Sequence, residues 1–208
     1  MRSSFYLVGA ALLAFCAAGS LQAQSASKEF SQLKKELNDV SKNADKFGSE
    51  LSKTMDSLRA LPTAEPKNLS KAFGNFRKNC DGLEKALKNA RDGMQSLKEK
   101  RQSYFAAWDK SSEAITDPDL KKASEERREK VKAQHTELSE QAAQVGQKID
   151  GFMSQINDLR KFLSADQSAP AIASAKPTID KVLASGTELS ADVQGISKKL
   201  SGFASGLS

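Results

Sequence analysis

Histidine, cysteine and aromatic residues are scarce in this sequence. Its 208 residues include one His, two Cys and one Trp, and aromatic residues make up only 6%. The single His135 has no Cys or second His at ligand spacing, which argues against a zinc site. No glycine-rich phosphate loop is present either. We therefore expect no catalytic residue, no metal and no cofactor, and hence no enzyme.

Long apolar runs are also lacking, except at the start of the chain. Arg2 is followed by an apolar run over 5–18 and by a small residue at Ala23. This run is too short for a bilayer-spanning helix and has the pattern of a secretory signal peptide. We expect residues 1–23 to be removed after Ala23, which leaves 24–208 as a periplasmic protein.

The two cysteines bear on export as well. Cys16 lies near the end of the apolar run, where bacterial lipoproteins carry their lipidated Cys. Phe15 is too bulky for the small position that precedes such a Cys, so lipidation is the less favoured alternative. Cleavage leaves Cys80 alone, and no intramolecular disulfide can form.

The charge of the chain is moderately basic and evenly mixed. Lys and Arg number 32 against 26 Asp and Glu, and the mean hydropathy is −0.53. Even the most basic stretch, 121–130, holds three acids among its eight charges. This mixing is typical of solvated helix faces and argues against nucleic acid as a partner. A weak attraction to an anionic envelope surface remains consistent with the positive excess.

Prolines divide the chain into four segments. Pro62 and Pro66 mark the first break, Asp117 and Pro118 the second, and Pro170 with Pro177 the third. Proline lacks a backbone donor and disrupts the preceding turn, so helices begin or end there. The predicted helices are about 25–61, 67–116, 118–166 and 171–206.

Apolar residues recur every three or four positions within each segment, as at Leu138, Ala142, Val145 and Ile149. This repeat predicts an all-α fold, an elongated antiparallel four-helix coiled-coil bundle. At 1.5 Å per residue the two central helices reach roughly 70 Å and the outer ones roughly 55 Å. We therefore expect both outer helices to stop short and a longer central helical hairpin to project about 15 Å beyond them.

The stripe of apolar residues that each helix turns towards its neighbours is called here its seam. In the two central helices the seam becomes polar towards the hairpin tip. Arg101, Arg128 and His135 continue the apolar stripes of the central helices. We interpret this polar seam as a solvated two-helix stem, and a functional polar site is the alternative. Cys80, by contrast, lies among apolar seam residues and is expected to be a buried, inert thiol.

An aromatic cluster near the tip is the sharpest candidate interaction site. Tyr104, Phe105 and Trp108 fall within five residues and include the single Trp. One interpretation is that they close the four-helix core with Phe30 and Phe203; the other is a partner-binding tip.

Several stretches resemble an uncharacterised bacterial family, the domain of unknown function numbered twenty-nine fifty-nine. The likeness spans about 69–200. The resemblance implies an exported or envelope-associated helical protein with no established activity. The matching stretches are Phe105-Ala106-Ala107-Trp108 with Glu113, Leu120 and Ser124, and Phe162-Leu163 with Ala171-Ile172-Ala173-Ser174.

Together these features predict a non-catalytic helical interaction protein of the cell envelope. A scaffold or a holdase-like binder with a protein partner is the leading hypothesis, and a second copy of the chain is a further candidate partner. The alternative is an envelope-binding module that holds anionic lipid or polysaccharide through Lys-rich helix faces.

Overall fold

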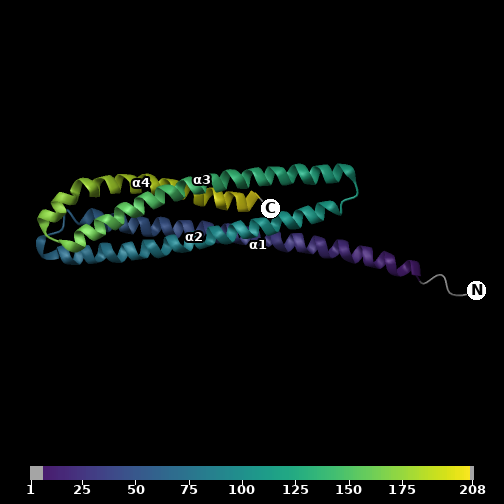
Figure 1. The fold of residues 1–208 in the computed structure, drawn as a ribbon, viewed down its shortest axis with the longest axis horizontal. Coiled ribbons are helices and arrows are strands. Elements are labelled where there is room, and N and C mark those ends of the chain that lie inside the picture. Colours follow the sequence, from purple (N-terminus) through teal and green to yellow (C-terminus); the bar gives the residue numbers. More distant parts are fainter. Residues whose placement is uncertain (1–6, 207–208) are drawn as a thin grey trace, which may run out of the picture.

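The computed structural model is a bundle of long helices (Figure 1). It describes the backbone of residues 7–206 and the side chains of residues 26–206. No strand occurs in that part of the chain, so the predicted all-α class is confirmed. The helices are α1 (Leu7–Ala60), the short 3-10 helix η1 (Pro66–Asn68), α2 (Leu69–Glu113), α3 (Pro118–Ala165) and α4 (Ala169–Gly206). The side chains of the predicted leader, with Cys16 and the cleavage position at Ala23, lie outside the described set.

The second break is set by local capping, as predicted. The Asp117 carboxylate accepts hydrogen bonds from the backbone N–H of Asp119 at 3.0 Å and of Leu120 at 2.9 Å. These bonds satisfy donors that the first turn of α3 leaves free, and Pro118 occupies the first helical position. The chain therefore turns sharply at the tip of the α2–α3 hairpin.

Pro177 does not act as the breaker that the sequence predicted. It lies on an exposed face inside α4, which already begins at Ala169. Proline costs the helix one backbone hydrogen bond, but on an exposed face water satisfies the freed carbonyl. Figure 1 shows α4 bent near its start, and Pro177 is the ninth residue of this helix.

The helices pack unevenly around the bundle. α1 packs most extensively on α2 and α4, and α3 packs mainly on α4. Among helices that are neighbours around the bundle, α2 and α3 contact each other least. α4 stops short of the hairpin tip, as predicted (Figure 1). The same prediction is wrong for α1, because Ala26 and Ser27 lie beside Ile115 at the tip. Three helices, rather than two, therefore form the tip.

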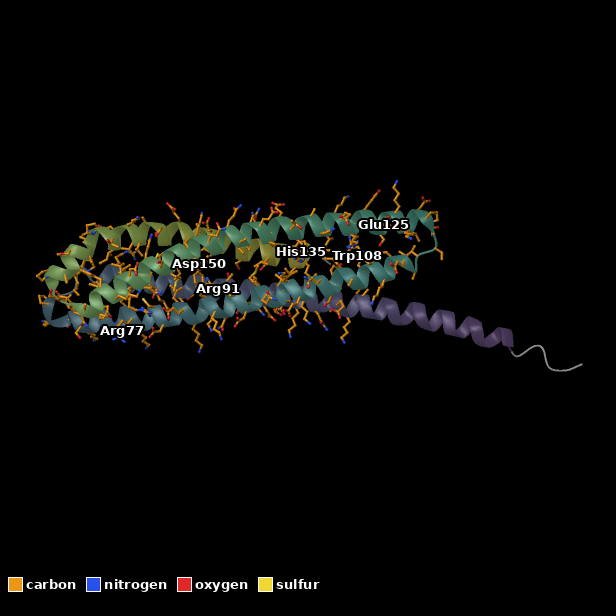
Figure 2. The ribbon with its side chains drawn as sticks, viewed as in Figure 1. Arg77, Arg91, Trp108, Glu125, His135 and Asp150 are labelled. Atoms are coloured by element: carbon orange, nitrogen blue, oxygen red, sulfur yellow. The ribbon has the colours of Figure 1, made fainter. Side chains whose placement is uncertain are left out.

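Long arginine side chains bridge the loose α2–α3 side at four levels. Figure 2 shows one of these bridges, with Arg91 of α2 and Asp150 of α3 on adjoining parts of the two helices. Exposed ion pairs contribute little to stability, so apolar packing on α4 holds α3 in place. The four bridges are Arg160 to Asp81 and Glu84, Arg91 to Asp150, Arg101 to Ser139, and Arg128 to Asp109.

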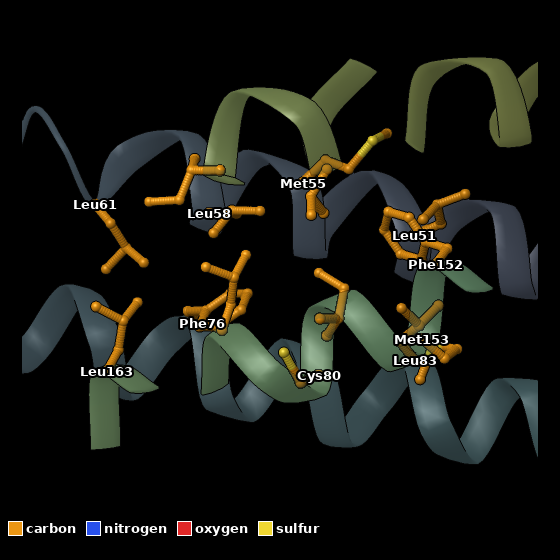
Figure 3. Close-up of a cluster of buried hydrophobic side chains, with 14 of the residues drawn as sticks. Leu51, Met55, Leu58, Leu61, Phe76, Cys80, Leu83, Phe152, Met153 and Leu163 are labelled. Atoms are coloured by element: carbon orange, nitrogen blue, oxygen red, sulfur yellow. The ribbon is translucent and has the colours of Figure 1, made fainter. Parts of the chain in front are cut away.

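The buried apolar side chains form two clusters along the bundle. The base cluster extends from the α1–α2 turn and is built on residues such as Leu51, Leu58, Phe76 and Leu163 (Figure 3). Cys80 lies within it and is fully buried, as the seam predicted. Burial raises the pKa of its thiol to about 12, although the nearby Arg160 acts in the opposite direction. The thiol is therefore held in its unreactive, neutral form.

A glycine permits the closest approach of α4 in the base cluster. A Cβ atom at Gly186 would lie 2.4 Å from Met55 Sδ and 2.9 Å from Phe152 Cε2. Only glycine leaves room for both side chains at that backbone position. At this level α4 therefore packs directly on side chains of both α1 and α3.

The second cluster lies towards the hairpin and is called here the hairpin-end cluster. Its fully buried members come from all four helices, and partly buried aromatic side chains pack against them. They are Leu33, Leu37, Val40, Leu97, Tyr104, Val131, Leu138, Leu200 and Ala204.

Candidate interaction site at the hairpin end

Tyr104 is the centre of the aromatic cluster. It is buried, and its ring lies 5.9 Å from Phe30, 5.5 Å from Phe105 and 5.4 Å from Trp108, centroid to centroid. Tilted and edge-on arrangements at such distances are favourable for aromatic pairs. The ring of Phe30 from α1 therefore belongs to the same layer as the three candidate residues of α2, as the sequence predicted.

Trp108 spans the hairpin between α2 and α3. Its indole Nε1–H donates a hydrogen bond to Ser124 Oγ at 2.9 Å, and Ser124 Oγ lies 2.7 Å from Ser112 Oγ. One side of the indole thus packs on Tyr104 while its polar edge is fixed by α3. Trp108 stays half-buried, so it is both a packing residue and a surface residue.

An open hollow of about 350 Å³ adjoins Trp108, and we name it the tip hollow. Its walls come from α1, α2 and α3, and Arg127 is its charged lining residue among the described side chains. Arg127 has no ion-pair partner among the residues whose side chains the structure describes. Lining residues include Ala26, Phe30, Tyr104, Trp108, Ile115 and Arg127.

His135 is buried, and the interpretation of a solvated stem is wrong at this position. Its side chain is 2% exposed and lies edge-on to Phe203, 4.6 Å away, and to Phe105, 6.2 Å away. The last turns of α4 cover it with Phe203, so two helices do not have to shield it alone. Burial and, as the smaller cause, the positive charge of Arg101 together lower the pKa of His135 to about 4. His135 is therefore neutral at physiological pH.

The other two polar-seam residues lie on different sides of His135. Arg101 donates through Nη1 to Ser139 Oγ at 3.1 Å, and Ser139 Oγ donates to the backbone carbonyl of His135 at 2.8 Å. Arg128 donates through Nη2 to Asp109 at 2.8 Å, and its guanidinium lies 5.5 Å from the centroid of Phe105. The three residues surround the aromatic layer but do not converge on one point. Figure 2 shows His135 and Trp108 along the hairpin, where they line its inner side.

No cluster of three or more His, Cys, Asp or Glu side chains suited to a metal ion occurs among the described residues. No described helix is long and apolar enough to cross a membrane. The polar groups at this end mainly join helices to one another.

A family model spans most of this architecture. It is described as a protein of unknown function (DUF2959) and matches residues 30–203. The chain belongs to this family. The matched DUF2959 region contains Phe30, the aromatic residues of α2 and Phe203, and so the entire aromatic layer. No curated protein and no solved structure matches the chain.

A cavity of about 380 Å³ that the sequence did not predict lies between the two apolar clusters. Ala44, Ala90 and Ala142 line it from three helices. Their small side chains at seam positions were visible in the sequence, and small residues that meet at one level leave space unfilled. Alanine at a seam position in each of three helices was the feature of the sequence that could have indicated the cavity.

Proposed function

We propose that this protein is an exported, non-catalytic interaction protein of the cell envelope that binds a protein partner at the hairpin tip. The observation that carries the proposal is the tip hollow, which combines apolar walls with the unpaired Arg127. Leu120 lies on α3 four residues before Ser124, a lining residue of the hollow, and is 63% exposed; exposed apolar side chains of this size favour contact with a partner. Half-buried aromatic residues such as Trp108 are frequent anchors of protein interfaces.

The chemistry of the hollow suggests its occupant. An apolar side chain of the partner fills the space between α1 and α2, and a neighbouring carboxylate faces Arg127. Charge-assisted hydrogen bonds between arginine and carboxylate are strong and give orientation. The partner is therefore a protein segment in which an acidic residue flanks an apolar one.

A scaffold fits the surface better than a holdase. Leu120 and Phe162 are the large apolar side chains with high exposure among the described residues, and they lie at opposite ends of α3. A holdase needs broad apolar surface for unfolded clients. A localised hollow instead supports one defined partner.

The absence of catalysis is part of the proposal. His135 is buried and neutral, and Cys80 is buried with a raised pKa, so neither is placed for acid–base or nucleophilic chemistry. Export is proposed from the leader pattern of residues 1–23. N-terminal mass spectrometry of the protein from cells should give a chain that begins at Gln24, and a lipid-modified Cys16 would refute soluble export.

Site-specific photo-crosslinking in intact cells tests the tip. A photoreactive residue at position 120 should give a defined protein adduct, whereas the same residue at the exposed Lys181 of α4 should not. Arg127→Glu should abolish the adduct, and Arg77→Glu is the matched control on the distant part of α2. Equal adducts from both positions, or an adduct unaffected by Arg127→Glu, would refute the tip as the binding site.

The second candidate is an envelope-binding module that holds anionic lipid or polysaccharide. Exposed basic side chains of α2 such as Lys71 and Arg77, which have no ion-pair partner among the described residues, favour it. Electrostatic binding of this kind weakens strongly as salt rises, because the charges are exposed. Co-sedimentation with anionic vesicles at low and high salt, compared with neutral vesicles, separates it from a protein interface anchored by apolar contacts.

A further inference from the structure

The apolar seam is interrupted halfway along the bundle. Apolar residues on both sides of this level are buried on all four helices, but at this level the apolar stripes of α2 and α3 are only half-buried. They face the cavity of about 380 Å³, which we name the central cavity. Its half-buried apolar lining includes Ala44, Ala90, Met94, Ala142, Val145 and Ile196.

The central cavity has the size and position of a ligand site. Small-molecule pockets in proteins have volumes of roughly 300 to 1,000 Å³, and helical bundles hold ligands between facing helices. On α3 the lining extends from Ser139 to Ile149, which corresponds to about 15 Å along the helix. The space is therefore elongated along the bundle, as a single alkyl chain requires.

The cavity opens on the loose side of the bundle. Its lining includes the exposed Arg91 and Gln95 of α2 and the exposed Ala143 of α3. Among helices that are neighbours around the bundle, these two contact each other least, and the ion pair of Arg91 with Asp150 joins them at this level. A ligand can therefore enter between α2 and α3 without displacing packed backbone.

One cation that contacts a lining residue of the cavity lacks a carboxylate partner among the described side chains. Of the four arginines that bridge α2 and α3, Arg101 is the one with no carboxylate within ion-pair distance among the described side chains. It is half-buried and donates to the hydroxyl of Ser139, which itself lines the cavity. Its charge acts on the interior, because it lowers the pKa of the buried His135. A half-buried cation without a counter-charge favours an anion.

We propose that the central cavity binds a fatty acid, whose alkyl chain lies between the four helices and whose carboxylate pairs with Arg101, next to Ser139. The apolar lining accounts for the chain, and the unpaired guanidinium accounts for the head group. A volume of about 380 Å³ fits one alkyl chain rather than the two chains of a phospholipid. This site is separate from the tip hollow, so it stands or falls independently of the proposed protein partner.

Displacement of a fluorescent fatty acid measures the binding. Dodecanoate should displace dansyl-undecanoate from the purified protein with saturation, and dodecanol should do so at least roughly tenfold less well, because it cannot pair with Arg101. Arg101→Gln should weaken dodecanoate binding roughly tenfold and remove its advantage over dodecanol. Arg77→Gln, which removes an exposed charge of the same helix far from the cavity, should leave both affinities unchanged.

Filling the cavity tests the chain site. Ala142→Leu should weaken the binding of both ligands by at least roughly tenfold, because the added side chain occupies the space of the alkyl chain. Ala133→Leu, on an exposed face of the same helix, is the matched control. Ala90→Leu fills the space from α2 and replaces Ala142→Leu if circular dichroism shows that variant to be unfolded.

Three outcomes would overturn the proposal. Absence of saturable binding to the wild-type protein would exclude the fatty acid. Unchanged binding by a folded cavity-filled variant would place the ligand elsewhere. Equal binding of dodecanol and dodecanoate, or equal losses in Arg101→Gln and Arg77→Gln, would remove Arg101 from the site.

Discussion

Acidification should destabilise this protein through a single group, His135. The folded state keeps this imidazole neutral, since burial and Arg101 lower its pKa to about 4 from the ordinary 6.5. In the unfolded chain the imidazole is solvated and regains its ordinary pKa. The unfolded state therefore takes up a proton at a higher pH than the folded state does. The free energy of unfolding consequently falls as the pH drops from about 6.5 to about 4.

The magnitude follows from the difference between the two pKa values. Each pKa unit corresponds to about 1.4 kcal/mol, so the full loss is about 3 kcal/mol once the pH has fallen below both values. Between about pH 7.5 and about pH 5, roughly 2 kcal/mol of this should already be lost. That range also lies above the ordinary pKa values of Asp and Glu, so carboxylates contribute little to the change.

Urea denaturation at a series of pH values measures this loss. The wild-type protein should lose stability at a slope that approaches about 1.4 kcal/mol per pH unit below pH 6. His135→Gln removes the titration and should give a nearly flat profile over the same range, whatever its stability at neutral pH. Because the chain has no other His, no second imidazole obscures the comparison. A flat wild-type profile, or equal slopes in the two proteins, would refute the burial of a neutral His135.

Three further predictions concern packing. The thiol of Cys80 should resist a bulky maleimide in the native protein and react once denaturant is added; rapid native labelling would place it outside the core. Gly186→Ala should lower the free energy of unfolding by about 1 to 3 kcal/mol through overpacking, whereas Gly151→Ala, with open space around it, should raise it by about 0.5 to 1 kcal/mol. Equal effects in thermal melts would contradict the close approach of α4. Trp108→Ala should cost about 2 kcal/mol, less than a fully buried Trp, and its loss should be non-additive with that of Tyr104→Ala; additive losses would mean that the two rings do not pack.

The sequence predicted the helices well because their boundaries depend on local chemistry. The cap at Asp117 and the proline after it act within one turn, and the spacing of apolar residues identified Cys80 as buried before any packing was known. Pro177 shows where local chemistry is insufficient. A proline on an exposed helix face is tolerated, and the sequence alone did not distinguish that face.

The axial offsets between helices could not be read from the same pattern. The seam repeat fixes which face of a helix is buried but not how far the helix extends past its neighbours. α1 reaches Ile115, and the end of α4 covers His135 with Phe203. The polar residues expected on a solvated stem were therefore partly enclosed. The central cavity escaped prediction for a related reason, since it depends on Ala44, Ala90 and Ala142 meeting at the same level.

The sparse contact between α2 and α3 also has a consequence for the order of folding. α1 and α2 are joined by a short turn and pack closely, and α3 and α4 form a second pair of sequence neighbours. Local contacts of this kind form early, so each pair can assemble as its own hairpin. The two hairpins then dock mainly through α1 and α4, while the connection at Asp117 acts as a tether. Two fragments divided at this connection should accordingly reassociate into the native bundle.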